Sequence, residues 1–566
     1  MWGSDIIAEA ISRCGFGFAA INPGASYRGL HDSLVNNPAS KIPLITCLHE
    51  EHAVALAHGW TKVTDAPALA IVHSNVGTLH ASMAVYNAWA DRAPVFILSA
   101  TGAMDATRRR PWIEWIHTVQ DQAQILRPFT KWDDQPASAE AAARSIAHGR
   151  LIAAQAPQGP VHVCLDVSDQ EATARAGSDV TELVSLADID DPGLTERQAA
   201  LIADSLAQAK RPLFVFGRLT RDSAAWDDRV ALVEATGART MTDIRSAAAF
   251  PTDHPSHVGA PGFAPDAAQR RALAACDLLV MFDPIDPATL VDLAPDSQAL
   301  LIGADLQAHR GWVKDAHALP RRGFYYPVPP NGAAAAIFAR IASDRASAPT
   351  AWRVPVEESA PDAAAAAHSL PPPAAFARLA IGLRRLRDEG TPLAITRLPL
   401  SWDGALLPIR HPLDYLGRDG GEGLASGPGM SVGIALALRG TGRLPVAILG
   451  DGDFMMGATA LWTAAREKLP LLVIIAANGV YGNDVLHQER IALERSRNTE
   501  NRWIGQQLDG PKIRIADLAK SLGVVTAERI DETDAGLEDA IVRLGRLALQ
   551  ESGPVMLEVM MPAVTT

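Results

Sequence analysis

The stretch PVAILGDGDFMMGATALWTAAREKLPLLVIIAANGVYG, residues 445–482, decides the fold class. It holds two short apolar runs, 445–449 and 471–475, separated by a segment with helical character. Apolar runs of this length, bounded by turn residues, are typical of strands that are buried on both faces of a parallel sheet. The stretch therefore predicts a strand, a helix and a second strand of an α/β domain.

Polar and glycine residues follow each of these two strands. Residues 450–453 (GDGD) come directly after the first strand, and residues 478–482 (NGVYG) come directly after the second. Because the carboxyl ends of neighbouring parallel strands meet at one edge of a sheet, we expect Asp451 and Asn478 to emerge there together. Glycines at such a turn let a helix N-terminus face an anion, and Mg²⁺ accepts carboxylate, amide, carbonyl and phosphate oxygens. The pattern predicts a magnesium and diphosphate site; the alternative is two ordinary turns.

The same alternation of strand-like and helix-like segments extends along the whole chain. Further strands are expected at 17–21, 66–72, 94–98, 161–165, 212–216, 278–282, 299–302 and 554–559, with a helix at about 76–90. A polar stretch at 174–191 and an Ala-, Pro- and Ser-rich stretch at 343–373 are typical of connectors. The sequence thus predicts three α/β domains with doubly wound parallel sheets, over residues 1–173, 190–342 and 374–566.

Composition excludes several classes of protein. The 566 residues carry a net charge of −13, which argues against nucleic-acid binding. No apolar stretch is long enough to cross a membrane, and the N-terminus lacks the basic and apolar regions of an export signal. The four cysteines form no CxxC pair, so neither a zinc nor a redox motif is supported and a reducing compartment is the simpler inference. We expect a cytoplasmic protein.

The two turn motifs, at their observed spacing, resemble those of the thiamine-diphosphate-dependent enzymes of the pyruvate oxidase/acetolactate synthase superfamily. In that family a GDG motif and a later Asn-Asn bind Mg²⁺ and the diphosphate of the cofactor. The resemblance implies a pyrimidine, a central and a diphosphate domain. It assigns the metal to Asp451, Asn478 and the carbonyl of Val480, and assigns cofactor contacts to Gly450, Asp451, Gly452, Asp453, Asn478 and Tyr481. Ala477 replaces the first family asparagine, which is not the metal ligand.

A second family motif lies in the N-terminal segment, at residues 49–60 (HEEHAVALAHGW). The family places its activating glutamate at the head of a helix in such a run. The resemblance implies that Glu50 acts at the aminopyrimidine ring and drives removal of the thiazolium proton, which is general acid/base work. Glu51 would point elsewhere on the helix. Without the resemblance, a glutamate that opens a helix is commonly a surface residue favoured by the helix dipole.

Glu50 and Asp451 lie far apart along the chain, and this separation suggests how subunits associate. In the family, the first domain of one subunit faces the third domain of another across a dimer interface. The resemblance therefore implies a homodimer or a dimer of dimers, a homotetramer, in which the two residues lie at opposite ends of one cofactor.

Several short stretches resemble benzoylformate decarboxylase-like members of the superfamily: 22–24, 73–78, 87–89, 156–160 and 460–465. The resemblance implies that His73 is a pocket histidine that transfers a proton to the substrate. The alternative is a strand-end histidine bonded to the backbone. Ser26 or Ala25 occupies the position of the family's pocket serine, and the simplest gapless alignment gives Ala25, which argues against a catalytic serine there. The family's second pocket histidine would fall at 282–286, where the sequence has none.

The turn at residues 426–430 (SGPGM) corresponds to the family segment whose bulky Leu or Met bends the cofactor. Pro428 aligns with that residue; either Pro428 fills this space or Met430 substitutes after a local shift. We expect Gly427 and Met430 to contact the cofactor. These departures argue that the substrate is not benzoylformate itself.

The expected function is non-oxidative decarboxylation of a 2-oxo acid to an aldehyde. Alternatives are an acetolactate-synthase-like carboligase, a lyase acting on a 2-hydroxyacyl thioester, and a non-catalytic paralogue that only binds. The central segment has no glycine-rich nucleotide fingerprint, so a flavin is not expected there.

Overall fold

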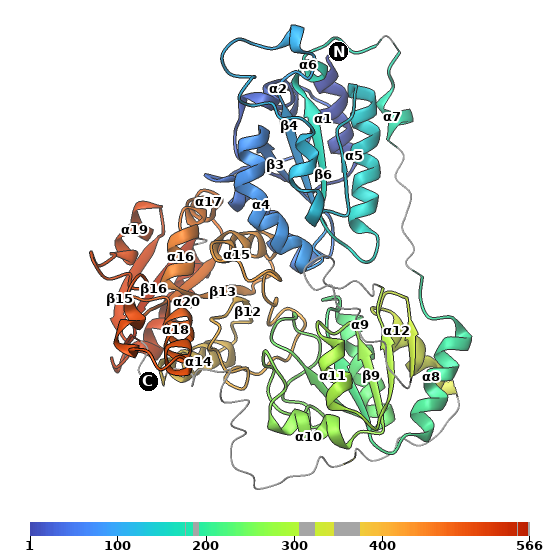
Figure 1. Ribbon diagram of the computed structural model, residues 1–566, viewed down its shortest axis with the longest axis vertical. Coiled ribbons are helices and arrows are strands. Elements are labelled where there is room, and N and C mark those ends of the chain that lie inside the picture. Colours follow the sequence, from blue (N-terminus) through green and yellow to red (C-terminus); the bar gives the residue numbers. More distant parts are fainter. Residues whose placement is uncertain are drawn as a thin grey trace.

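The computed structural model describes residues 1–175, 177–184, 192–304, 323–343, 352, 374–551 and 553–563. These residues contain three sheets, each covered by helices (Figure 1). All strand pairs within the three sheets are parallel. The predicted fold class is therefore confirmed, and each sheet lies inside one of the three segments expected to be domains. The exact domain bounds stay a prediction.

The first sheet has six strands in the order β2-β1-β3-β4-β6-β5. They are β1 (Ala19–Ile21), β2 (Leu44–Thr46), β3 (Ala68–His73), β4 (Val95–Thr101), β5 (Trp132–Asp134) and β6 (Val161–Asp166). The helices around it are α1 (Gly3–Arg13), α2 (Arg28–Asn36), α3 (Glu50–Thr64), α4 (Ser74–Ala90), α5 (Ala139–Ala154), α6 (Val167–Gln170) and α7 (Val180–Leu183). Its central strands are buried because they consist almost wholly of apolar residues.

The second sheet has five strands in the order β11-β10-β9-β7-β8. They are β7 (Pro212–Phe216), β8 (Arg239–Thr242), β9 (Leu278–Phe282), β10 (Gln298–Ile302) and β11 (Gly323–Tyr326). The helices around it are α8 (Glu196–Gln208), α9 (Ser223–Thr236), α10 (Ala267–Ala275), α11 (Pro287–Leu293) and α12 (Ala333–Ser343). Two separate clusters of buried apolar side chains cover its two faces.

The third sheet has five strands in the order β12-β13-β14-β16-β15. They are β12 (Leu393–Arg397), β13 (Leu444–Gly450), β14 (Leu471–Ala477), β15 (Thr526–Asp531) and β16 (Pro554–Met560). The helices around it are α14 (Ala374–Asp388), α15 (Ser426–Ala437), α16 (Asp451–Gly457), α17 (Ala460–Arg466), α18 (Gly482–Glu494), α19 (Ile515–Ser521) and α20 (Leu537–Glu551). No helix among the described residues is long and apolar enough to cross a bilayer.

The structure describes much of the first expected connector and little of the second. Within 174–191, the prediction of a linker is wrong for Val180–Leu183, which forms α7. Asp179 caps this short helix, and Val180 is buried in the core of the first sheet, so a single apolar anchor outweighs the polar composition. Of 343–373, only Ser343 and Trp352 are described, and the Trp352 indole donates to the Pro212 carbonyl at 2.9 Å. The rest of that stretch lies outside the described residues.

Helices α3 and α15 join the first and third units through one continuous core. This core contains Val54 and Leu56 of α3, Val432 of α15, and strand residues from both sheets. The two helices approach so closely that a Cβ atom added at Gly433 would lie 1.9 Å from the Leu56 carbonyl oxygen. A side chain at position 433 would therefore force the helices apart.

We expect Gly433→Ala to destabilise the protein by about 1–3 kcal/mol, the usual cost of overpacking a core. Thermal or denaturant unfolding measures this loss. Gly332→Ala is the matched control, because a Cβ atom there meets nothing within 4 Å. Equal stability of the two variants would show that the helices are not in close contact.

Candidate active site

The carboxyl edge of the third sheet brings the two turn motifs together. Strands β13 and β14 are neighbours, with Gly450 paired to Ala476. Asp451 opens α16, and its Oδ2 accepts a hydrogen bond from the backbone N–H of Gly479 at 2.7 Å. The Asn478 Oδ1 accepts from the backbone N–H of Val480 at 3.1 Å. The expectation that Asp451 and Asn478 emerge side by side is confirmed.

A cavity of about 650 Å³ opens at this edge. Seven of the predicted cofactor or metal residues line it: Gly450, Asp451, Gly452, Asp453, Asn478, Val480 and Tyr481. The first turn of α18 also lines it, through Gly482, Asn483 and Asp484. A helix N-terminus beside oxygen ligands suits a diphosphate that is bridged by a hard cation. The residues present therefore fit the predicted group.

Backbone hydrogen bonds hold the Asp451 carboxylate in place. Burial raises its pKa, while the backbone N–H groups of Gly479 and Gly452 act in the opposite direction. Its Oδ1 accepts from the backbone N–H of Gly452 at 2.8 Å, so a backbone donor holds each carboxylate oxygen. These bonds fix the orientation of the carboxylate.

The first turn of α15, which holds residues 426–430, is not part of the lining of this cavity. Gly427 approaches Asp453 so closely that a Cβ atom would lie 2.9 Å from Asp453 Oδ2. Met430 is fully buried in a small apolar cluster with Ala394 and Leu416. The expected cofactor contacts of Gly427 and Met430 stay predictions, and Pro428 packs near Gly457.

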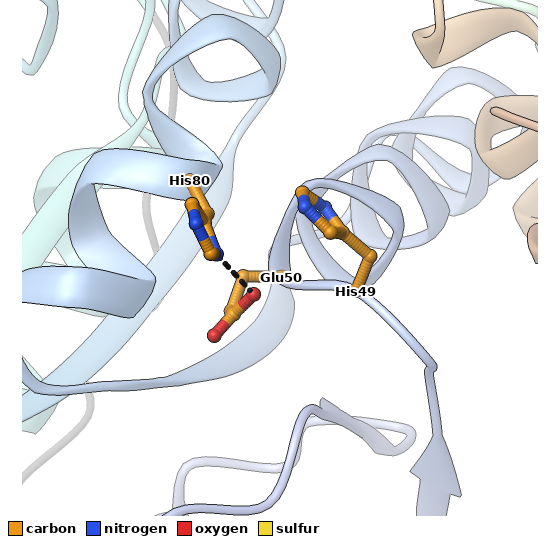
Figure 2. Close-up of side chains that lie close together, drawn as sticks. All are labelled: His49, Glu50 and His80. Atoms are coloured by element: carbon orange, nitrogen blue, oxygen red, sulfur yellow. Dashed lines mark hydrogen bonds and ion pairs between the residues drawn. The ribbon is translucent and has the colours of Figure 1, made fainter. Parts of the chain in front are cut away.

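Glu50 lies at the head of α3 in the first unit, where the sequence places it. Its side chain is buried, and its Oε2 is 3.0 Å from Nδ1 of His80 on α4 (Figure 2). Its Cγ and Oε1 pack against Gly77, where an added Cβ atom would lie 3.1 Å from both. His49 begins the helix, because its Nδ1 accepts from the backbone N–H of Glu51.

Glu51 points away from this group, as expected for the next residue on a helix. Its Oε1 accepts from the Ser426 hydroxyl at 3.4 Å, across the contact between α3 and α15. The pKa of Glu51 is raised, chiefly by burial. The hydrogen bond from Ser426 acts in the opposite direction, and the negative charge of Asp453 adds to the rise. Glu51 thus faces the third unit of its own chain, whereas Glu50 faces His80.

His73 ends β3 and is hydrogen-bonded to a serine. Its Nδ1 is 2.9 Å from the Ser26 hydroxyl and 3.4 Å from the Ser26 backbone N–H, and the Ser74 N–H donates to the same hydroxyl. Because the backbone N–H of Ser26 donates to Nδ1, the hydrogen of the neutral ring lies on Nε2. Burial, followed by the charge of His117, lowers the pKa of His73 to about 4. The ring is therefore neutral near pH 7 and presents an N–H donor.

Of the two residues that could stand at the family's pocket serine, Ser26 is the one that lies beside His73. Ala25 is exposed, whereas Ser26 is buried and bonds to His73. Both residues belong to a 3₁₀ turn at Ala25–Tyr27, and the turn directs the second of them inward. The turn, which the gapless alignment does not take into account, therefore places Ser26 rather than Ala25 next to His73.

A second histidine near His73 comes from an unexpected part of the chain. The ring centroid of His117, in the segment after β4, lies 4.8 Å from that of His73, with the rings perpendicular. His117 is not among the residues predicted from the sequence, which places the family's second pocket histidine at 282–286 in the central unit. No local pattern marks His117, because it is brought to His73 by the loop that leaves β4.

Family models identify all three units of the chain. The N-terminal thiamine pyrophosphate binding domain of thiamine pyrophosphate enzymes matches residues 1–125, the central domain of these enzymes matches 199–283, and their C-terminal thiamine pyrophosphate binding domain matches 400–559. The turn motifs and most of the cavity lining belong to the last of these matches, and Glu50 and His73 belong to the first.

Individual relatives and solved structures agree with these matches. Benzoylformate decarboxylase from Pseudomonas aeruginosa is 26% identical, over 77% of this chain and 79% of the relative. Acetolactate synthase 1 from the chloroplasts of Nicotiana tabacum is 24% identical, over 99% of this chain and 82% of the relative. A thiamine diphosphate-dependent 4-hydroxybenzoylformate decarboxylase from Rhodococcus jostii RHA1 has the same fold, with a TM-score of 0.78, 22% identity and full coverage of both chains. The chain therefore belongs to the thiamine pyrophosphate enzymes.

Proposed function

We propose that this protein is a thiamine-diphosphate-dependent lyase that removes carbon dioxide from a 2-oxo acid and releases an aldehyde. The observation that carries the proposal is the cavity at the edge of the third sheet, lined by Asp451, Asn478 and the first turn of α18. The relationship to benzoylformate decarboxylase supports the choice of reaction. The departure from the family pattern at Pro428 argues that the substrate is a 2-oxo acid other than benzoylformate.

Within this proposal, Asp451, Asn478 and the Val480 carbonyl hold Mg²⁺. The turn at 450–453 and the N-terminus of α18 receive the diphosphate. The bound cofactor supplies an electron sink for the bond to the departing carboxylate. Every ligand is a hard oxygen atom, which favours Mg²⁺ over softer metals.

Two residues of the first unit would act on the reacting groups. Glu50 would exchange a proton with the pyrimidine ring of the cofactor, from a buried position in which few water molecules compete. His73 is neutral near pH 7 and carries its hydrogen on Nε2, so it would offer a hydrogen bond to the product or its precursor. Ser26 fixes the ring of His73 for this hydrogen bond.

We also propose that two chains share each site, in a homodimer or a dimer of dimers. The cavity that contains Asp451 is lined only by residues from 374–562, within the part of the chain that the structure describes. Glu50 of the same chain faces His80 instead, and Leu48 and Leu79 around it are 46% and 56% exposed. A second copy would cover these apolar side chains and bring its own cavity to Glu50.

We expect light scattering after size exclusion to give a mass of at least twice 60.1 kDa in the presence of cofactor and Mg²⁺. Dilution until dimers dissociate should abolish turnover, because neither half of the site is complete. A fully active monomer would contradict shared sites without affecting the assignment of Asp451.

The reaction itself is tested by incubating the holoprotein with a panel of 2-oxo acids. We expect release of carbon dioxide and an equal amount of aldehyde from at least one of them. A second candidate is a carboligase, which is supported by the match of nearly the whole chain to an acetolactate synthase. Release of carbon dioxide with a longer hydroxyketone or hydroxy acid in place of aldehyde would favour that candidate.

A further inference from the structure

The Glu50 carboxylate is in contact with a histidine, His80, that has no role in any of the steps proposed above. His80 lies on α4, and its Nδ1 is 3.0 Å from Glu50 Oε2 (Figure 2). Its side chain is 58% exposed, yet its ring is held in place by a stack on His49, with centroids 5.0 Å apart and planes at 21°. His49 is itself fixed by its hydrogen bond at the start of α3.

The three side chains could be mistaken for a metal site, because His49, Glu50 and His80 have ligand atoms within 4.8 Å of one another. The ring geometry argues against it. Imidazole lone pairs lie in the plane of the ring, and the two rings are nearly parallel. The lone pairs of two stacked rings lie in separate planes, which does not suit convergence on one ion at the roughly 2 Å that a zinc-like metal requires. The stack is better suited to orient one hydrogen bond.

That hydrogen bond restricts the carboxylate of Glu50. Gly77 limits its movement on the side of Cγ and Oε1, since even a Cβ atom there would lie only 3.1 Å away. His80 holds Oε2 from the other side, through a hydrogen bond that the charge on the carboxylate strengthens. When one oxygen of a carboxylate is held, the direction of its other oxygen is also fixed. Proton transfer to a partner at a fixed position requires such a fixed direction.

We propose that His80 is a positioning residue that orients the Glu50 carboxylate for proton exchange with the cofactor. The proposal rests on the proposed role of Glu50. His80 acts through Glu50 and makes no contact with Mg²⁺ or the diphosphate, whose predicted ligands lie in the third unit. Removing His80 therefore slows proton exchange and leaves cofactor affinity unchanged.

The test compares His80→Ala with His80→Asn in the holoprotein. Asparagine carries an amide donor at about the position of Nδ1, so it restores the hydrogen bond without an imidazole. The measurements are the rate of hydrogen–deuterium exchange at the thiazolium carbon, followed by quenching and NMR, and the affinity for thiamine diphosphate by calorimetry. We expect His80→Ala to slow exchange about tenfold or more, with affinity changed less than about threefold, and His80→Asn to recover most of the rate.

A crystal structure of the unliganded His80→Ala protein gives a readout that is independent of turnover. We expect the Glu50 carboxylate to leave its place beside Gly77 or to adopt more than one conformation, and to return in His80→Asn. His31→Ala, an exposed histidine on α2, is the control and should match the wild type throughout. Wild-type exchange in His80→Ala, or equal loss in both His80 variants, would overturn the proposal.

Glu50→Gln distinguishes this proposal from the one on which it depends. If Glu50→Gln exchanges slowly while His80→Ala matches the wild type, only the positioning role fails. If Glu50→Gln exchanges at the wild-type rate, the proposed role of Glu50 fails, and the His80 proposal fails with it.

Discussion

Replacing Asp451 with alanine is expected to weaken the binding of thiamine diphosphate in the presence of Mg²⁺ by about 100-fold or more. The carboxylate is the only full negative charge among the three proposed metal ligands, so its loss leaves the cation too weakly held to bridge the diphosphate. Calorimetric titration of the apoprotein with cofactor at fixed Mg²⁺ measures this loss. Turnover should disappear with it at ordinary cofactor concentrations.

The control for this prediction is Asp484→Ala. Asp484 lines the same cavity from α18 but is exposed and has no proposed metal contact. It should leave cofactor affinity within about threefold, since it removes charge at a similar place without removing a ligand. Equal loss in both variants would mean that net charge in the cavity, rather than coordination by Asp451, governs binding. Unfolding curves check that Asp451→Ala still folds, because Asp451 also accepts two backbone hydrogen bonds.

Replacing Glu50 with glutamine is expected to lower turnover by at least about 100-fold while cofactor affinity stays within about tenfold. Glutamine fills the same space beside Gly77 but cannot exchange a proton at the pyrimidine ring. The affinity is spared because the proposed metal and diphosphate contacts belong to the third unit, 401 residues later in the chain. Steady-state kinetics with the best 2-oxo acid of the panel, together with calorimetry, measure the two effects.

Glu51→Gln is the matched control for that experiment. It changes the neighbouring carboxyl, which faces Ser426 instead of His80. It should retain most of the turnover. A large loss in Glu51→Gln with little loss in Glu50→Gln would show that the wrong member of the pair has been assigned, and that α3 presents its other side to the cofactor.

Much of the fold follows from local patterns. The runs at 212–216 and 278–282 are strands with the expected bounds, because uninterrupted apolar runs of this length are stable only when both faces of the sheet are covered. The polar composition of 174–191 was misleading at 180–183, because one buried valine is enough to dock a short helix. The average composition of the segment does not reveal a single buried residue such as Val180.

The sequence by itself determined the two turn motifs and the edge of the sheet at which they meet. Asp451 and Asn478 are separated by one strand–helix–strand unit, and a parallel sheet returns such residues to the same edge whatever the rest of the chain does. The position of Glu50 at the head of a helix was equally local, since it depends only on the residues around 49–60.

Only the tertiary structure decided which side chains surround Glu50 and His73. Ser26, His117 and His80 reach them from a 3₁₀ turn, a long loop and another helix. The same is true of α3 and α15, which lie more than 360 residues apart and meet through a glycine at 433. These contacts depend on how whole helices and loops pack, and packing is set by the shapes of distant surfaces rather than by any periodicity within one segment.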